Sequence, residues 1–339
     1  MRITYVLAHP EMNGGHKVVF QHVHLLREHG QEVTVLGQGA RPDWAGFDGP
    51  YQDYSTGPAR LADQDLVIAT FWTTLPVVRQ LGAGPVAHFC QGYEGGLAHL
   101  APRLREIEEV YAWPMPTLVV SPHLGDFLRA RFGRESAVAP PPLDPLFRPS
   151  RRPRFRPSRR PWIAVPGIFE SEVKGVPTAL EAIRRLRASG LAARVMRFTF
   201  LPLSPGEREL LEPDRYLCGV PPGEIARELR RCDLLLFPSR PEEGFGLPLL
   251  EAMASRVPAV ASRIPSTIHI AEGAVPLVPV GDAAAFASAA RELLTDARAW
   301  RRARTLGADA ARRYRPEAVA PRLLEAIRWA QTWERTCQP

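Results

Sequence analysis

Two glutamates, Glu243 and Glu251, flank a glycine-rich turn and are the residues of this chain best placed to do chemistry. Gly244 and Gly246 allow the backbone to turn tightly and to approach a ligand closely. Pro248 suits the first position of a helix, where its missing N–H group costs nothing. The free N–H groups and the dipole at a helix start favour an anion or a hydroxyl group. Both carboxylates can therefore face a polar ligand bound there.

A strand, a helix and a second strand must position these glutamates. Residues 234–237 form a short apolar run before Pro238, typical of a buried strand. The helix begins near Pro248, and residues 258–261 predict the next buried strand. Two glutamates on an ordinary strand–helix unit are usually only solvated. Here the glycines, the proline and both strands occur together, so we favour a binding site.

The first half of the chain alternates apolar strands with helical patterns. This alternation indicates βαβ units and a parallel sheet, in which ligands lie beyond the carboxyl ends of the strands. Gly14 and Gly15 follow the first strand and form the first candidate ligand loop. Strands are predicted at residues 3–8, 33–36, 66–70, 86–89 and 117–120, and a helix at residues 16–29.

Residues 137–161 are rich in proline and arginine, which argues against regular secondary structure and marks a domain boundary. We predict a first domain at 1–147, an extended linker at 148–160 and a second domain at 161–339. The second domain repeats the alternation of the first. Its predicted strands are residues 162–165, 195–200, 216–219, 234–237, 258–261 and 274–280, with helices at 177–189, 224–231, 282–295 and 297–332.

Composition and cysteine spacing exclude several classes of protein. With 339 residues and 45% apolar residues, the chain is a globular protein long enough for two domains. It has no apolar run of about 18 residues, and its start predicts a first strand rather than a signal peptide. Cys90, Cys218, Cys232 and Cys337 lack C-x-x-C spacing. This pattern argues against a disulfide framework and a zinc site, and it suits a reducing cytoplasm.

The positive charge of the chain is concentrated in one short segment. The net charge of +7 equals the charge of the seven arginines within residues 148–160. A basic segment can bind anionic lipid at roughly 1 kcal/mol per charge. We favour a solvated, self-repelling linker, with loose attachment to an anionic membrane as the alternative. Because the excess is confined to this segment, we expect no nucleic-acid partner.

Residues 243–254 carry a recognisable motif. Residues 243–248 read Glu-Gly-Phe-Gly-Leu-Pro and residues 251–254 read Glu-Ala-Met-Ala. This pattern resembles the E-x7-E signature of the family 4 retaining glycosyltransferases, and the resemblance extends over nearly the whole chain. It implies an α/β fold of the GT-B type, with two Rossmann-like domains whose parallel sheets face each other across a cleft. It also implies that the last helix crosses back to the first domain.

The resemblance also implies an activity. The protein would move a sugar, a hexose or deoxyhexose, from a nucleotide-diphosphate sugar to an acceptor hydroxyl, with retention of anomeric configuration. The acceptor would be a glycan or a lipid-linked molecule, in the biosynthesis of a glycan, polysaccharide or glycoconjugate. The enzyme would be cytoplasmic, with peripheral attachment to the inner face of the membrane as the alternative noted above.

In the second domain, the family motif assigns a role to each glutamate. Glu251 would hold the ribose hydroxyls of the nucleotide, and Glu243 would hold hydroxyls of the donor sugar. The backbone N–H groups of Phe245, Gly246 and Leu247 would meet the sugar or phosphate.

Two further residues of the second domain are similar to family positions. Lys174, followed by Gly175, looks like the lysine that neutralises the leaving diphosphate, a task suited to a compact charge. Val220 would present backbone groups to the base. The leaving phosphate would itself accept the proton of the acceptor, so the resemblance implies neither a metal nor a cofactor.

In the first domain, Gly14 and Gly15 look like the Gly-Gly loop that meets the donor phosphate or the acceptor. Gln91, Tyr93 and Glu94 follow a strand on the side where the resemblance places the acceptor. Gln91 stands where many relatives have a histidine. This stretch is similar to a bacterial subgroup that includes rhamnosyltransferases of cell-surface glycans.

One departure from the family concerns the diphosphate. The family usually has an arginine a few residues before the lysine, and Ile168 stands at that place. Either this diphosphate-binding charge is missing, or another residue such as Arg240 or Arg263 supplies it. Two rival functions stay open: a nucleotide-sugar epimerase of the same fold, and a non-catalytic basic binding protein, which would leave both glutamates unexplained.

Overall fold

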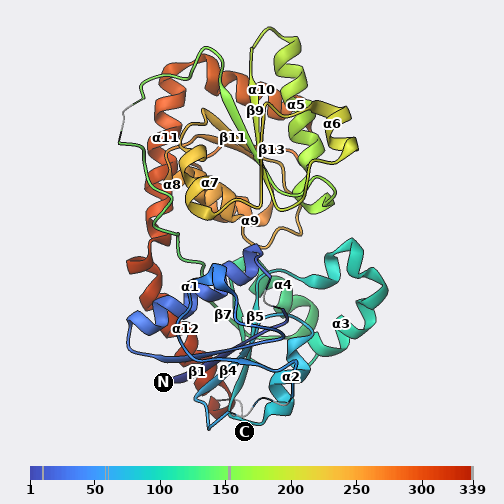
Figure 1. Cartoon of the computed structure of the whole chain (residues 1–339), viewed down its shortest axis with the longest axis vertical. Coiled ribbons are helices and arrows are strands. Elements are labelled where there is room, and N and C mark those ends of the chain that lie inside the picture. The colour runs from blue at the N-terminus through green and yellow to red at the C-terminus, as the bar shows by residue number, and fades with distance from the viewer. Residues whose placement is uncertain (10, 58, 60, 152–153, 337–339) are drawn as a thin grey trace. The chain divides into compact units, whose positions relative to one another are not determined.

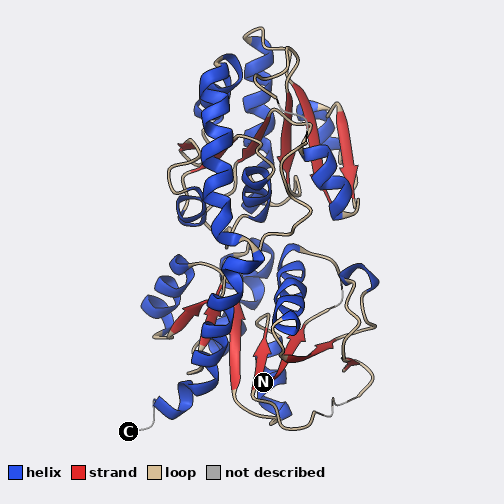
Figure 2. Cartoon of the chain, turned by 90° about the vertical axis from the view of Figure 1, so that its left-hand side faces the viewer, coloured by secondary structure: helices blue, strands red, loops and turns tan. Residues whose placement is uncertain are grey.

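The computed structural model describes residues 1–9, 11–57, 59, 61–151 and 154–336 (Figure 1). The chain divides into two compact units. Unit 1 comprises Met1–Pro142 and Tyr314–Pro339, and unit 2 comprises Leu143–Arg313. Each unit contains one parallel sheet, and Figure 2 shows helices on both faces of each sheet.

Unit 1 is built on a seven-stranded sheet in the order β3-β2-β1-β4-β5-β6-β7, with parallel pairing. The central strand β1 is buried from Ile3 to Leu7, because helices cover both faces of the sheet. The strands are β1 (Arg2–Leu7), β2 (Glu32–Gly37), β3 (Tyr51–Asp53), β4 (Leu66–Ala69), β5 (Val86–Cys90), β6 (Thr117–Val119) and β7 (Ser136–Val138). The main helices are α1 (Gly14–Glu28), α2 (Thr74–Leu81), α3 (Leu104–Tyr111), α4 (Pro122–Phe132) and α12 (Pro316–Thr336).

The last helix of the chain, α12, packs in unit 1 against α1 and strands β4 to β7. Its buried side chains recur every three or four residues, so one face of the helix enters the core. These side chains are Val319, Leu323, Ile327 and Ala330. The sequence placed residues up to 339 in the second domain and expected this helix to cross to the first, which is where it lies.

Unit 2 is built on a six-stranded parallel sheet in the order β10-β9-β8-β11-β12-β13. Alternate strand residues such as Ile163, Val195 and Leu234 pack with α5 and α10 in one core cluster. The strands are β8 (Trp162–Pro166), β9 (Arg194–Thr199), β10 (Arg215–Cys218), β11 (Leu234–Phe237), β12 (Ala259–Ser262) and β13 (Leu277–Val278). The helices are α5 (Val176–Ala188), α6 (Pro205–Leu211), α7 (Pro222–Leu229), α8 (Leu247–Ala254), α9 (Pro265–Ala271), α10 (Ala283–Thr295) and α11 (Ala297–Ala311).

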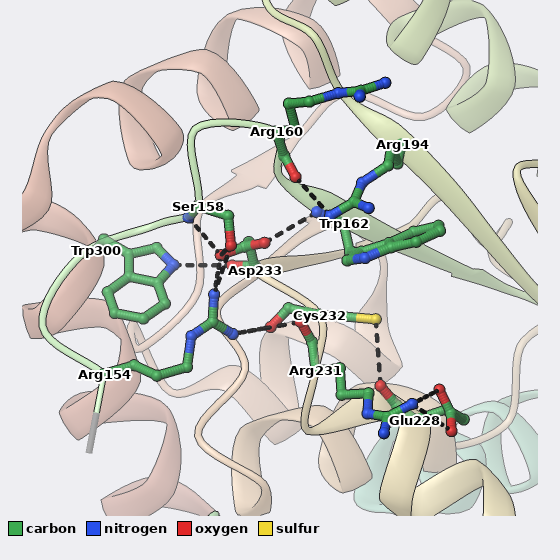
Figure 3. A network of polar contacts seen from close by, with 10 residues as sticks. All are labelled: Arg154, Ser158, Arg160, Trp162, Arg194, Glu228, Arg231, Cys232, Asp233 and Trp300. Atoms are coloured by element: carbon green, nitrogen blue, oxygen red, sulfur yellow. Dashed lines mark hydrogen bonds and ion pairs between the residues drawn. The ribbon is translucent and has the colours of Figure 1, made fainter. Parts of the chain in front are cut away.

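The arginine-rich segment differs from its prediction. Instead of a free linker, its described part is attached to unit 2 around Asp233, which is fully buried (Figure 3). Arg154 forms an ion pair with the Asp233 carboxylate, and the backbone N–H of Ser158 donates to it at 2.9 Å. The Trp300 indole donates to the Asp233 carbonyl at 2.8 Å. A buried carboxylate requires such donors, so Asp233 holds the described part of this segment in place.

The domain boundary and the ends of the first sheet also differ from expectation. The first compact stretch ends at Pro142 rather than at residue 147. Strand β7 occupies Ser136–Val138, so two residues of the stretch predicted to lack regular structure pair with β6. They can pair because the prolines begin only at Pro140. Strands β3 and β7 form the two edges of the sheet with three residues each, too short to show a pattern in the sequence.

Three cysteines in the described residues are free thiols: Cys90 and Cys232 are buried, and Cys218 is exposed. The fourth, Cys337, lies outside the described residues, as do Arg152 and Pro153 of the arginine-rich segment.

Among the described helices, none combines the length and apolar character needed to cross a membrane.

Candidate functional site

Lys174 and Glu243 follow the carboxyl ends of two neighbouring strands, β8 and β11. In the sheet order, the chain proceeds outward from β8 in one direction and outward from β11 in the other. The gap between these strands is therefore a topological switch point, where open parallel sheets bind their ligands. The sequence predicted both residues separately, and the fold brings them to this point.

The side chains of Lys174, Glu243 and Ser239 form one cluster. The Lys174 ammonium lies 2.8 Å from Oε2 of Glu243, and the Ser239 hydroxyl donates to the same oxygen at 3.0 Å. Ser239 is fully buried, and the side chain of Glu243 is only 11% exposed, whereas that of Lys174 is 36% exposed. A cation that solvent can reach is thus held by a nearly buried carboxylate. No local pattern singled out Ser239.

The loop that carries Lys174 is fixed against the loop after β11. Gly175 has φ +59°, and a Cβ atom added there would lie 2.2 Å from the Pro238 carbonyl oxygen. The backbone N–H of Arg240 donates to the Val173 carbonyl at 2.8 Å. Only glycine fits this close approach, so the backbone positions Lys174 before any ligand arrives.

A buried arginine, Arg197, holds the start of the same loop through its backbone. Arg197 on β9 is fully buried, forms an ion pair with buried Glu207 and donates to the Gly167 carbonyl at 2.8 Å. Gly167 has φ +107°, and a Cβ atom there would come within 3.0 Å of the Lys174 side chain. The sequence offered only a charged residue in a strand as a hint of this support.

The start of α8 provides the predicted helix N-terminus. Gly246 has φ +102°, and its carbonyl accepts hydrogen bonds from the N–H groups of Leu249 and Leu250. The helix begins at Leu247, so Pro248 is its second residue rather than its first. Glu251 is half-buried on this helix.

The remaining predicted donor residues lie on the same edge of the sheet. Phe245 is buried in the loop that leads into α8. Val220 follows β10 after Gly219, whose φ of +61° turns the chain at the end of that strand. These loops all follow the carboxyl ends of strands in one sheet. In that sheet β10 lies two strands away from β8, so Val220 is further from Lys174 than the loop after β11 is.

In unit 1, the structure brings the glycine pair together with Gln91. Helix α1 begins at Gly14, and the Asn13 side chain caps it by accepting from the His16 N–H group at 2.8 Å. The Gln91 amide donates to the Gly15 carbonyl at 3.1 Å. A Cβ atom on Gly15 would lie 3.2 Å from the Gln91 amide nitrogen, a tight contact that would require the Gln91 side chain to shift by a few tenths of an ångström.

Tyr93 and Glu94, expected on the acceptor side, have their side chains in the packing of unit 1. The Tyr93 ring packs 4.9 Å from Phe127 and 5.2 Å from Tyr111, between ring centroids. Glu94 is buried and accepts a hydrogen bond from the Tyr111 hydroxyl, and burial raises its pKa to about 7. Both side chains hold the loop after β5, so this geometry does not favour direct acceptor contact. Of the three predicted residues, Gln91 alone meets the glycine pair.

The fold is that of the GT-B glycosyltransferases, which confirms the fold class predicted from the sequence. Sucrose-phosphate synthase from Thermosynechococcus elongatus superposes with a TM-score of 0.76 at 17% identity, covering 99% of this chain and 100% of that one. Anabaena HepE, solved in complex with UDP-glucose, superposes with a TM-score of 0.77 at 14% identity, covering 97% and 99%.

The match to a family model lies within unit 2. Residues 160–296 match the family of glycosyl transferases group 1, and this range contains Lys174, Glu243 and Glu251. Phosphatidyl-myo-inositol mannosyltransferase from Mycobacterium leprae is 35% identical over 125 residues, which are 36% of this chain and 33% of that protein. The putative colanic acid biosynthesis glycosyltransferase WcaL from Salmonella typhimurium is 34% identical over 135 residues, 35% of this chain and 32% of that protein. The matched part thus spans about a third of these relatives' length.

Proposed function

We propose that this protein is a retaining glycosyltransferase that uses a nucleotide-diphosphate sugar. The observation that carries the proposal is the cluster of Lys174, Ser239 and Glu243 at the switch point of the sheet in unit 2. It provides a cation for a diphosphate and a carboxylate for sugar hydroxyls beside the start of α8. The match of residues 160–296 to glycosyl transferases group 1 supports the same activity.

Lys174 neutralises the charge that develops on the departing diphosphate, the main electrostatic task of this reaction. The N-terminus of α8, at Phe245, Gly246 and Leu247, adds backbone N–H groups. Arg240 is exposed and its backbone bonds the residue before Lys174, which favours it as the second cation. Arg263 instead directs its guanidinium to the Leu277 carbonyl at 3.4 Å.

Glu243 holds hydroxyls of the donor sugar, Glu251 holds the ribose, and the backbone at Val220 meets the base. The bond from the anomeric carbon to the phosphate oxygen breaks, and its electron pair leaves with the diphosphate. The acceptor oxygen then bonds to the same face of the sugar, while its proton passes to the leaving phosphate oxygen. This sequence retains the anomeric configuration, and it requires no metal because Lys174 and α8 supply the positive charge.

The substrates follow from the relatives as proposals. HepE, solved with UDP-glucose, supports a nucleotide sugar as donor, with a hexose or deoxyhexose to be transferred. The mannosyltransferase and WcaL support a glycan or lipid-linked acceptor, in polysaccharide or glycoconjugate biosynthesis. Gly14 and Gly15 meet the donor phosphate or the acceptor, and Gln91 lies on the acceptor side of unit 1. The free thiols of Cys90 and Cys232 accord with a cytoplasmic location.

Loose contact with an anionic membrane is part of this proposal. Phe155 is 68% exposed, and Arg156, Arg159 and Arg160 beside it are also exposed. An aromatic ring among cations suits the surface of anionic lipid. Flotation with vesicles containing phosphatidylserine should capture the wild type more than a variant with these three arginines changed to Gln. Equal flotation of both proteins, or none, would sink the membrane contact.

A thermal-shift panel of nucleotide sugars tests the activity first. A donor present at 100 times its dissociation constant should stabilise the protein by about 2.7 kcal/mol. Transfer with the best donor is then followed by NMR to read the product anomer. A retained anomer on an acceptor is expected. An inverted anomer excludes the mechanism, an epimerised nucleotide sugar without acceptor turnover indicates the epimerase, and no donor binding indicates the basic binding protein.

A further inference from the structure

The positive charge of Lys174 is already compensated in the site without a ligand. Its ammonium lies 2.8 Å from a carboxylate oxygen of Glu243 that also accepts the Ser239 hydroxyl. This pairing is built into the backbone, because Gly175 and Pro238 are in close approach and Arg240 bonds the carbonyl of Val173. Neither loop can withdraw without breaking these contacts.

When a nucleoside diphosphate without a sugar binds, the Lys174 ammonium is therefore already paired with the Glu243 carboxylate. To bind Lys174 it must displace Glu243, whose side chain is only 11% exposed. The displaced carboxylate keeps the Ser239 hydroxyl but loses its cation, and it then lies close to the anionic diphosphate. A nearly buried carboxylate without its cation is unfavourable, and like charges repel.

A nucleotide that carries a sugar does not incur this loss. Its sugar hydroxyls can donate to the Glu243 carboxylate at the moment when Lys174 turns to the diphosphate. The long, flexible lysine side chain, which is 36% exposed, can make this change of partner without moving the backbone. One ligand replaces both halves of the pair, whereas the free diphosphate replaces only one.

We propose that the Lys174–Glu243 ion pair makes the site select the sugar-bearing donor over the free nucleoside diphosphate. This inference rests on the proposed function, because it takes the diphosphate and the sugar as the ligands of the cluster. Glu243 thereby acts as a specificity residue that weakens binding of the spent nucleotide. Its loss should tighten the binding of that nucleotide, the opposite of what the loss of a binding residue usually does.

Isothermal titration with UDP, GDP and dTDP, and with the sugar nucleotides UDP-glucose, GDP-mannose and dTDP-rhamnose, tests this selection. Glu243→Gln keeps an acceptor for the Ser239 hydroxyl and removes the charge. It should bind the matching nucleoside diphosphate about tenfold more tightly than the wild type, since a hydrogen bond to a charged group is exchanged. The preference for the sugar nucleotide should shrink by a similar factor.

The neighbouring Glu242 provides a matched control, because it is exposed and its substitution by Gln removes the same charge one residue away from Glu243. Glu242→Gln should leave the affinities within about twofold, as expected for a solvated charge. In a Lys174→Met background, Glu243→Gln should give a clearly smaller gain, so that the two changes are coupled in a double-mutant cycle. Unchanged melting temperatures establish that each variant is folded.

Three outcomes would overturn the inference. The first is that Glu243→Gln binds the nucleoside diphosphate as weakly as the wild type, or more weakly. The second is that Glu242→Gln tightens binding to the same extent, and the third is that the gain persists in full without Lys174. In each of these cases the wild type still binds nucleotide, so the proposed function stands. If the wild type binds none of the six probes, the proposed function fails and the inference fails with it.

Discussion

The two ends of strand β11 carry carboxylates that use their cations differently. Asp233 precedes the strand and is fully buried; its Oδ1 faces Arg154 and accepts from Ser158, and its Oδ2 accepts the Trp162 N–H at 2.9 Å. Glu243 follows the strand, and its Oε2 binds Lys174 and Ser239.

The difference lies in how far each cation can move. The guanidinium of Arg154 also donates to the carbonyls of Arg231 and Cys232, at 3.3 and 3.1 Å, so it is fixed in one geometry. Lys174 is a single ammonium on a flexible stem, with a more exposed side chain. A saturated, immobile pair holds the fold, whereas a pair with a mobile cation can exchange partners with a ligand. Sequence alone does not distinguish them.

Removing the saturated carboxylate should have the largest effect. Asp233→Ala takes the carboxylate partner from Arg154 and leaves the Ser158 and Trp162 N–H groups without their acceptor. Unit 2 should lose about 3–5 kcal/mol of stability, the usual cost of breaking a buried pair. Hydrogen exchange in β8 and β11 measures this loss for unit 2 by itself.

The matched control for this change is Asp309→Ala, because the Asp309 side chain is 50% exposed and pairs with Arg312, three residues further along the chain. Its effect should stay within about 0.5 kcal/mol. A loss below 1 kcal/mol for Asp233→Ala would show that the arginine-rich segment is not anchored there.

A third carboxylate, Glu94, is also buried, but its hydrogen-bond donor is the Tyr111 hydroxyl instead of a cation. Comparing it with Asp233 and Glu243 therefore tests what a cation contributes to a buried carboxylate. Burial raises the pKa of Glu94 from 4.5 to about 7. Between these values the folded state binds more protons than the unfolded state. The free energy of unfolding that this protonated carboxyl contributes is therefore fully present below pH 4.5. It falls as the pH rises to about 7, by an amount on the order of 3 kcal/mol.

Glu94→Gln should remove this pH dependence, as hydrogen exchange of α3 and β5 at pH 5 and pH 8 would reveal. Glu109→Gln, on an exposed face of α3, is the control and should keep it. An unchanged slope in the Glu94 variant would mean that the buried carboxyl does not titrate in this range.

Changes at the Lys174–Glu243 pair, whose cation is mobile, should affect catalysis rather than folding. Glu243→Ala should lower turnover about ten- to a hundredfold, because its contacts to the sugar strengthen as the glycosidic bond breaks. Glu251→Ala should instead raise the Michaelis constant for the donor, since ribose is held equally in substrate and transition state. Steady-state kinetics with the identified donor separate the two effects. Wild-type kinetics in both variants would falsify the site.

The smallest effect is expected within the arginine-rich segment. Arg159 is exposed, so Arg159→Gln should change the stability of unit 2 by less than about 0.5 kcal/mol. Arg154→Gln, five residues earlier in the same segment, should cost clearly more, because it strips Asp233 of its cation. Chemical denaturation of both variants compares them directly, and equal losses would contradict the anchoring role of Arg154.

Local pattern determined much of this protein. The apolar runs at β1, β4 and β11 predicted buried strands, and the glycines before α8 predicted the helix start with Glu243 at its loop. Because each of these features depends on residues close in the chain, periodicity and turn chemistry are enough to find them. The family motif then linked Glu243 and Lys174 to one function, without stating that they touch.

Tertiary structure alone decided which side chains meet. Lys174 and Glu243 are 69 positions apart, and Arg154 and Asp233 are 79 apart. Their pairing depends on β8 and β11 being neighbours, an order set by packing across the whole sheet. Tyr93 likewise turned inward because three aromatic rings from α3 and α4 give it a better environment than water. The direction of a side chain depends on neighbours distant in the sequence, and no local pattern records them.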